Sequence, residues 1–159
     1  MAQSEATLSK LAPMARLTLE LLGPAQIACD GQPLTFAYEK VQALLVYLAV
    51  EAGRAHRRTA LAELLWPEQN EAAARHNLSQ ALFILRRALR DDPQSPLLLT
   101  TRDSVRLNPA SAVWLDVAAF QALVSGPNSG TIQLQQASEL VCGEFLEGFS
   151  SGDSAGFEE

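Results

Sequence analysis

The chain has 159 residues, of which 48% are hydrophobic and 19% are charged, and its formal net charge is −6. This length and composition suffice for one folded domain, or for one domain and part of another. The longest apolar run, residues 43–50, is far shorter than the roughly 18 residues that a membrane helix needs, and the N-terminus lacks signal-peptide features. We therefore expect a cytoplasmic protein without membrane contact, in which Cys29 and Cys142 are free thiols.

The charge is distributed unevenly along the chain. Residues 54–106 carry nine arginines and six acidic residues, a net charge of +3, whereas residues 107–159 carry seven acidic residues and no lysine or arginine. The middle segment can therefore face a polyanion, while the acidic segment has to face a different partner.

The first elements that we expect are strands. Residues 1–14 are interpreted as a flexible tail. Residues 16–36 alternate apolar and polar side chains between turn signals, and the pair Asp30-Gly31 is a strong hairpin signal. This pattern predicts two or three short antiparallel strands.

Two helices follow. Helical periodicity over residues 38–52 predicts the first helix, with Gly53 at the position just past its C-terminus. Thr59 is the expected N-cap of a short second helix, which Pro67 ends.

The third helix is expected over residues 70–90, with Asn70 as its N-cap and Glu71 in its first turn. Residues 97–109 then read as a hairpin with a tight turn at 102–104. A long basic helix that follows a short one, with a hairpin behind it, is the pattern of a winged helix-turn-helix preceded by a small sheet.

The remaining segments are predicted to be helical, with a helix over residues 115–124, a flexible linker at 125–130, and a last helix with a loop within 131–149. The fold class that we expect is therefore α+β.

The third helix is amphipathic. Its predicted buried stripe consists of Ala74, Leu78, Ala81, Leu82, Leu85 and Leu89. The opposite face carries Arg75, His76, Ser79, Gln80, Phe83, Arg86, Arg87 and Arg90. Ser79 and Gln80 can hydrogen-bond base edges, arginines can reach phosphates or guanine, and Phe83 can pack on a thymine methyl group. A merely solvated basic face accounts for the arginines but not for Phe83 and its neighbour Ile84, for which packing against another domain is the alternative.

Several segments, in order, resemble the N-terminal region of SARP-type bacterial transcriptional regulators. The most specific are "LLWPE" and "NLSQALFILRRAL", and "LELLG", "DGQPL", "KVQALLVYLAV" and "VRLNP" support them. The resemblance implies an OmpR-like winged-helix domain at residues 15–109. It also implies that residues 110–159 begin a helical bacterial transcriptional activation domain (BTAD), which is related to tetratricopeptide repeats. We expect this second domain to be truncated, because repeat architectures need about three or more units.

The resemblance also assigns functions to single residues. It places the recognition helix, which enters the major groove, at about residues 70–90 and the wing at 97–108. Thr101 and Arg102 match the wing tip, which usually enters the minor groove, and Ile84 stands where relatives often have an arginine. Together with the residues singled out by periodicity, the predicted DNA-binding set is Arg57, Arg58, Arg75, His76, Asn77, Ser79, Gln80, Phe83, Arg86, Arg87, Thr101 and Arg102.

The predicted partner is double-stranded DNA, with RNA polymerase or other proteins as further candidates and a homodimer on repeated half-sites as one option. The alternative is a protein-interaction module, whose basic face packs on its own acidic helical part or on a partner protein. Phe83 and Ile84 would then anchor the interface.

An enzyme is not expected. The sequence contains no Gly-rich phosphate loop and no nucleophile or redox motif, and we predict no cofactor and no metal. His56 and His76 are interpreted as parts of a basic surface, and Asp91 and Asp92 as a solvated turn. Trp66 and Trp114 are expected in the core.

Overall fold

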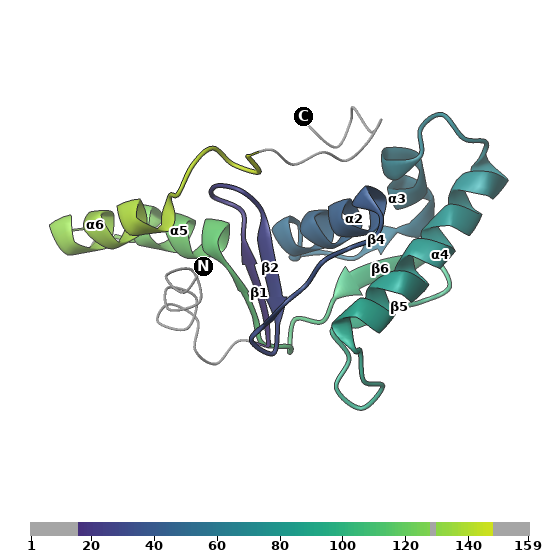
Figure 1. Cartoon of the computed structure of the whole chain (residues 1–159), viewed down its shortest axis with the longest axis horizontal. Coiled ribbons are helices and arrows are strands. Elements are labelled where there is room, and N and C mark those ends of the chain that lie inside the picture. The colour runs from purple at the N-terminus through teal and green to yellow at the C-terminus, as the bar shows by residue number, and fades with distance from the viewer. Residues whose placement is uncertain (1–15, 128–129, 148–159) are drawn as a thin grey trace. The chain divides into compact units, whose positions relative to one another are not determined.

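The computed structural model describes residues 16–127 and 130–147 (Figure 1). The expected tail at 1–14, part of the expected linker at 125–130 and the segment after residue 147 lie outside the described residues. The described residues form two compact units, one made of residues 16–35 with 112–127 and 130–147, and the other of residues 36–111. The expected domain boundaries, at 15–109 and 110–159, remain predictions.

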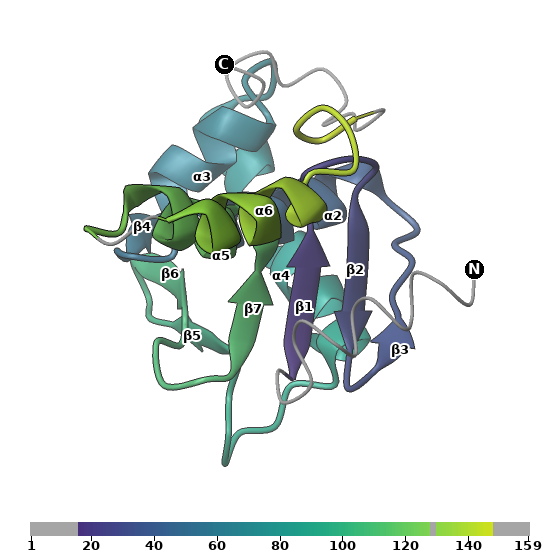
Figure 2. The ribbon, with the colours of Figure 1, turned by 90° about the vertical axis from the view of Figure 1, so that its left-hand side faces the viewer.

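The first unit contains a four-stranded sheet with the order β3-β2-β1-β7 (Figure 2). Its strands are β1 (Leu17–Glu20), β2 (Gln26–Cys29), β3 (Gln32–Pro33) and β7 (Val113–Leu115). The strands β1, β2 and β3 pair antiparallel, and β7 pairs parallel with β1. Asp30 and Gly31 adopt φ angles of 50° and 78°, the backbone of a tight hairpin turn. The predicted antiparallel strands and their turn are therefore confirmed.

Two helices complete this unit. The helices α5 (Asp116–Ser125) and α6 (Thr131–Leu140) pack on each other (Figure 2). The segment after α6 returns to the end of β1, where the Cys142 N–H donates to the Leu22 carbonyl (2.7 Å) and the Leu146 N–H donates to the Leu21 carbonyl (2.7 Å). Backbone hydrogen bonds thus join the predicted C-terminal helices to the first strand.

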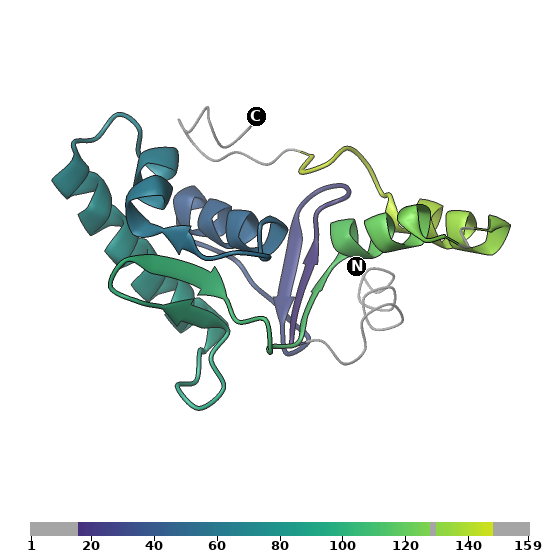
Figure 3. The same ribbon diagram turned by 180° about the vertical axis from the view of Figure 1, so that it is seen from behind.

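The second unit contains three helices and a small antiparallel sheet with the order β4-β6-β5 (Figure 3). Along the chain, its elements are α2 (Glu39–Val50), β4 (His56–Arg57), α3 (Arg58–Leu65), α4 (Glu71–Leu89), β5 (Leu98–Thr100) and β6 (Ser104–Leu107). The pair α3 and α4 is the helix-turn-helix, and the β5–β6 hairpin behind it is the wing. The predicted α+β winged helix followed by helices is confirmed.

The helices of this unit enclose an apolar core. It is built by Val41, Leu44, Leu45, Leu48, Leu61, Leu65, Leu78, Leu82, Leu85 and Leu89, all at most 4% exposed. The Lys40 ammonium group also donates to the Leu65 carbonyl (2.6 Å), so one side chain satisfies a carbonyl at the end of α3. Because α3 and α4 share this core, the outward face of α4 has a rigid support.

Two predicted helix ends are wrong. Gly53 does not follow the last residue of α2, because α2 ends at Val50 and its C-cap is Glu51, whose N–H donates to the Tyr47 carbonyl. Thr59 is not an N-cap, because α3 begins at Arg58 directly after β4. The Arg58 N–H donates to the Asp103 carbonyl (2.9 Å), so the wing supplies a partner for the start of α3.

Three side chains are placed differently from the sequence interpretation. His56 is not part of a basic surface, since it is 6% exposed, its Nε2 donates a hydrogen bond to the Glu51 carbonyl (2.9 Å), and its ring packs on the Tyr47 ring. Trp66 and Trp114 are half-buried rather than fully buried. The strands β4 and β7 were not predicted at all.

Candidate nucleic-acid interface

The helix α4 has well-defined ends. The Asn70 side-chain oxygen accepts a hydrogen bond from the Ala73 N–H (2.8 Å), which confirms the predicted N-cap. At the other end Arg90 adopts a left-handed φ of 51°, and the Asp91 N–H donates to the Arg86 carbonyl (3.0 Å). The buried residues of α4 are the predicted stripe Ala74, Leu78, Ala81, Leu82, Leu85 and Leu89. The helix is therefore oriented as its periodicity indicated.

The outward face of α4 exposes a mixed set of side chains: Arg75, His76, Ser79, Gln80, Phe83 and Arg87, whereas Asn77 is half-buried. Two hydrogen bonds order the polar ones. The Ser79 hydroxyl donates to the Arg75 carbonyl (3.1 Å), and the Gln80 Nε2 lies 3.1 Å from the His76 Nε2. We call this set the outer face of α4.

Phe83 lies within this outer face, with Arg87 one turn further along the helix. Phe83 is 62% exposed, and the Arg87 guanidinium carbon lies 5.8 Å from the centre of its ring. This distance lies within the range of a cation–π interaction, which contributes about 0.5–1 kcal/mol between exposed side chains. Ile84, beside them, is half-buried.

Arg86 differs from Arg87 although the two are adjacent in sequence. Its Nη2 donates to the Thr100 hydroxyl (2.5 Å) on β5, and its Nη1 lies 3.8 Å from the Asp91 carboxylate. Asp91 also accepts hydrogen bonds from the Leu97 N–H (2.6 Å) and the Leu98 N–H (3.4 Å). The structure thus places Arg86 as a brace between α4 and the wing.

The interpretation of Asp91 as part of a solvated turn is therefore wrong, because only 3% of its side chain is exposed. Its neighbour Asp92 is exposed and accepts a hydrogen bond from the Gln94 N–H (2.9 Å). The local sequence pattern does not predict that Asp91 accepts hydrogen bonds from Leu97 and Leu98, because this contact depends on where β5 packs.

The turn of the wing is fixed by its own hydrogen bonds. The Thr101 hydroxyl accepts from the Asp103 N–H (3.2 Å) and the Ser104 N–H (2.9 Å), so this predicted site residue shapes the turn. The Arg58 Nε donates to the Thr101 carbonyl (3.0 Å) and so joins the start of α3 to the wing. Arg57 and Arg102 are exposed.

A hollow of about 240 Å³ lies between α3 and α4. Glu63 and Glu71 line it together with Trp66 and Arg75, so its carboxylates disfavour a phosphate group. Among residues 16–127 and 130–147, no group of three or more His, Cys, Asp or Glu side chains is placed to hold a metal ion. No helix in this part of the chain is long and apolar enough to cross a membrane.

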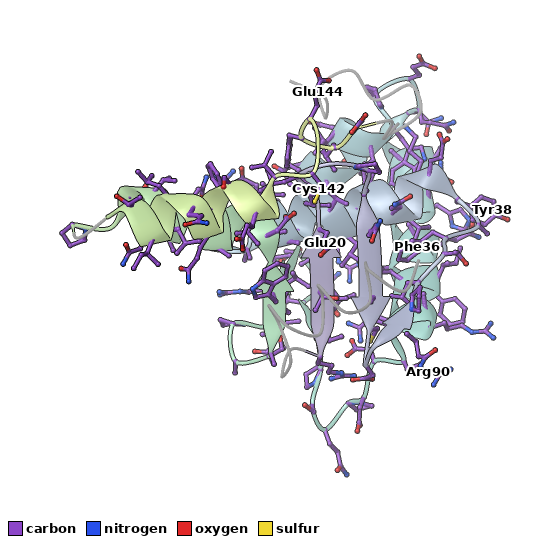
Figure 4. The ribbon with its side chains drawn as sticks, turned by 60° about the vertical axis from the view of Figure 1, so that its left-hand side comes forward. Glu20, Phe36, Tyr38, Arg90, Cys142 and Glu144 are labelled. Atoms are coloured by element: carbon purple, nitrogen blue, oxygen red, sulfur yellow. The ribbon has the colours of Figure 1, made fainter. Side chains whose placement is uncertain are left out.

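The carboxyl groups with perturbed pKa values belong to the sheet unit rather than to α4. Asp116 accepts hydrogen bonds from the Leu21 and Leu22 N–H groups (2.9 Å each). Burial nevertheless raises the pKa of Asp116 above its usual range. Burial also raises the pKa of Glu20, on β1, and the negative charge of Asp116 raises it further. Figure 4 shows Glu20 on β1 and Cys142 in the segment that follows α6.

Comparisons with known proteins agree with this geometry. Residues 33–105 match the model of a family described as "transcriptional regulatory protein, C terminal". Among solved structures, the chain is similar to EmbR of Mycobacterium tuberculosis in complex with a low affinity phosphopeptide. The identity is 26%, the match covers 84% of this chain and 38% of that chain, and the TM-score is 0.62. The chain thus spans less than half the length of EmbR. No curated protein matches the chain at a significant level.

The fold and the match of residues 33–105 point to one class, which is the winged-helix domains of transcriptional regulatory proteins. Within that class, the likeness to EmbR, itself a SARP-family regulator, confirms the resemblance to SARP-type regulators that the sequence motifs indicated. Regulators of this kind are typically not enzymes.

Proposed function

We propose that this chain binds double-stranded DNA with α4 in the major groove and the wing at residues 97–108 along the adjacent minor groove. Residues 15–109 form the DNA-binding domain in this proposal, and residues 110–159 begin a helical activation domain. The observation that carries it is the outer face of α4, on which cationic and hydrogen-bonding side chains surround one aromatic ring on a helix whose other face is buried. Such a face combines phosphate neutralisation with readout of base edges.

The candidate residues divide into two groups by their contacts. Side chains that reach outward are proposed to touch DNA: Arg57, Arg75, His76, Ser79, Gln80, Phe83, Arg87 and Arg102. Side chains held by other parts of the protein are proposed to position them: Arg58, Arg86 and Thr101, which fix the wing, and the half-buried Asn77 on α4.

Adjacent arginines provide the test. Arg87 lies on the outer face, whereas Arg86 is held by Thr100 and Asp91. The purified chain is titrated against a mixed-sequence duplex at several salt concentrations. We expect Arg87→Ala to flatten the slope of log K against log salt by about one unit, because one phosphate contact is lost.

The matched variant is Arg86→Ala. It is expected to weaken binding through the position of the wing, with a smaller change of the salt slope. No binding of the parent chain at low salt would refute the proposal, and equal slopes for the parent and Arg87→Ala would remove Arg87 from the DNA contacts.

The charge distribution favours a second candidate function. Residues 107–159 have no basic side chain and seven acidic ones, while residues 54–106 have a net charge of +3. In this candidate the basic face of the winged helix binds the acidic helical part or an acidic partner protein, and DNA binding is masked. It predicts no binding to duplex at low salt by the chain as it stands.

Protein partners follow from the first candidate. We propose that two chains occupy half-sites about one helical turn apart, and that RNA polymerase is contacted from the DNA-bound state. Sedimentation of the chain with duplexes that carry one or two half-sites tests the stoichiometry. One chain bound to the two-site duplex, at saturating protein, would contradict the dimer.

A further inference from the structure

Phe83 has no apolar neighbours of its own kind on the outer face of α4. Among the described residues, it is the one large apolar side chain of α4 that is exposed, at 62%. Gln80 lies one turn before it and Arg87 one turn after it. The fully buried core of a protein-docking surface is usually more apolar than the rest of the protein surface. The surroundings of Phe83 are instead polar and cationic, which suits a polyanion that presents a small apolar group.

DNA presents such a group in the major groove. The base edges there are lined with hydrogen-bond donors and acceptors, and the 5-methyl group of thymine is the apolar exception. We propose that Phe83 reads this methyl group and makes the chain prefer thymine at one position of each half-site. This inference rests on the proposed function, since α4 must lie in the major groove.

The geometry of α4 places a cation beside the ring. The Arg87 guanidinium carbon lies 5.8 Å from the ring centre, within cation–π range, so the aromatic ring and a charge that can meet a phosphate lie together on the outer face. Gln80 precedes Phe83 by three residues, which corresponds to about 4.5 Å along the helix axis. Because stacked bases are about 3.4 Å apart, we expect the two side chains to face neighbouring base pairs when α4 runs along the major groove. The thymine read by Phe83 therefore lies next to the base read by Gln80.

The experiment begins with duplexes that the chain itself selects from a random-sequence library. In a selected duplex each thymine is replaced, one at a time, by deoxyuridine, which removes only the methyl group. Loss of one buried methyl contact is expected to weaken binding of the parent chain about 4-fold at one position per half-site. The other thymines are expected to tolerate the replacement.

Variants then assign the effect to the ring. Phe83→Ala is expected to bind thymine and uracil equally at that position, while Phe83→Leu keeps part of the preference. Gln80→Ala is the matched control, and it is expected to keep the thymine preference while losing selectivity at the neighbouring base. Circular dichroism checks that the variants fold. We expect them to fold, because the side chains of Phe83 and Gln80 are both exposed.

The outcomes separate the two claims. Selected duplexes with no methyl-sensitive thymine, or a methyl effect that survives in Phe83→Ala, would overturn the inference and leave DNA binding intact. Phe83 would then be a contact for a protein partner. Failure to bind any duplex at low salt would overturn the proposed function and this inference with it.

Discussion

Asp91 is expected to hold the wing against α4, and its replacement by alanine tests this directly. The substitution removes the acceptor for the Leu97 N–H (2.6 Å) and the Leu98 N–H (3.4 Å). An unpaired, partly buried N–H group costs about 1–3 kcal/mol. The ion pair with Arg86 adds little, because the Arg86 side chain is 40% exposed. We therefore expect Asp91→Ala to lower the free energy of unfolding by about 2 kcal/mol.

The matched control is Asp92→Ala, because Asp92 is exposed and accepts one hydrogen bond, from the Gln94 N–H. It is expected to cost less than about 0.5 kcal/mol. Both changes are made in a Trp114→Phe background, so that Trp66 is the remaining tryptophan. Its fluorescence then reports the urea unfolding of the second unit, residues 36–111, to which Trp66 belongs. Equal losses of stability for the two variants would refute the assignment of Asp91 as the residue that holds the wing against α4.

Three further predictions concern stability. Gly23 has a φ of 143°, and a Cβ there would lie 3.2 Å from the Cβ of Cys142, so Gly23→Ala is expected to cost about 1–3 kcal/mol, measured by thermal unfolding. Glu20 has a raised pKa from burial and from Asp116, so the folded state binds its proton more tightly than the unfolded state does. The free energy of unfolding should therefore rise as the pH falls through the pKa of Glu20 in the folded state. Glu20→Gln should raise the free energy of unfolding at pH 7 and flatten its dependence on pH. A pH dependence that is unchanged in this variant would show that Glu20 does not cause it. Asn70→Ala removes the cap of α4 and is expected to cost about 1 kcal/mol, whereas an unchanged midpoint in urea would show that the cap contributes nothing.

Much of the winged helix could be predicted because its signals are local. The buried stripe of α4, from Ala74 to Leu89, repeats with the helical period, and one periodic pattern is enough to orient a helix. The cap at Asn70 and the turn at Asp30 and Gly31 likewise depend on neighbouring residues alone. Family resemblance then supplied the order of the elements.

Two of the failures have a common physical cause, which is that the decisive partner lies far along the chain. The strand β4 contains only His56 and Arg57, too few for any alternation to be visible, and it exists because β6 pairs with it. Thr59 is not the N-cap because α3 begins one residue earlier, at Arg58, whose N–H donates to the Asp103 carbonyl. Short strands and caps of this kind are decided by tertiary pairing.

The candidate site shows the same limit. Arg86 and Arg87 are equivalent to a reader of the sequence, since both fall on the outward side of the helical pattern. Thr100 and Asp91 separate them, because these residues hold Arg86 and leave Arg87 beside Phe83. Periodicity can choose a face of a helix, but it cannot tell which side chains on that face are already engaged.

We propose that the outer face of α4 and the wing turn are the surface that meets DNA. The most direct measurement is a titration of the 15N-labelled chain with a selected duplex, followed by NMR amide shifts. We expect the shifts to concentrate in α4 and at residues 101–103, while the amides of α5 and α6 stay in place. Shifts centred on α5 and α6, or an α4 that does not respond to bound duplex, would contradict this proposal.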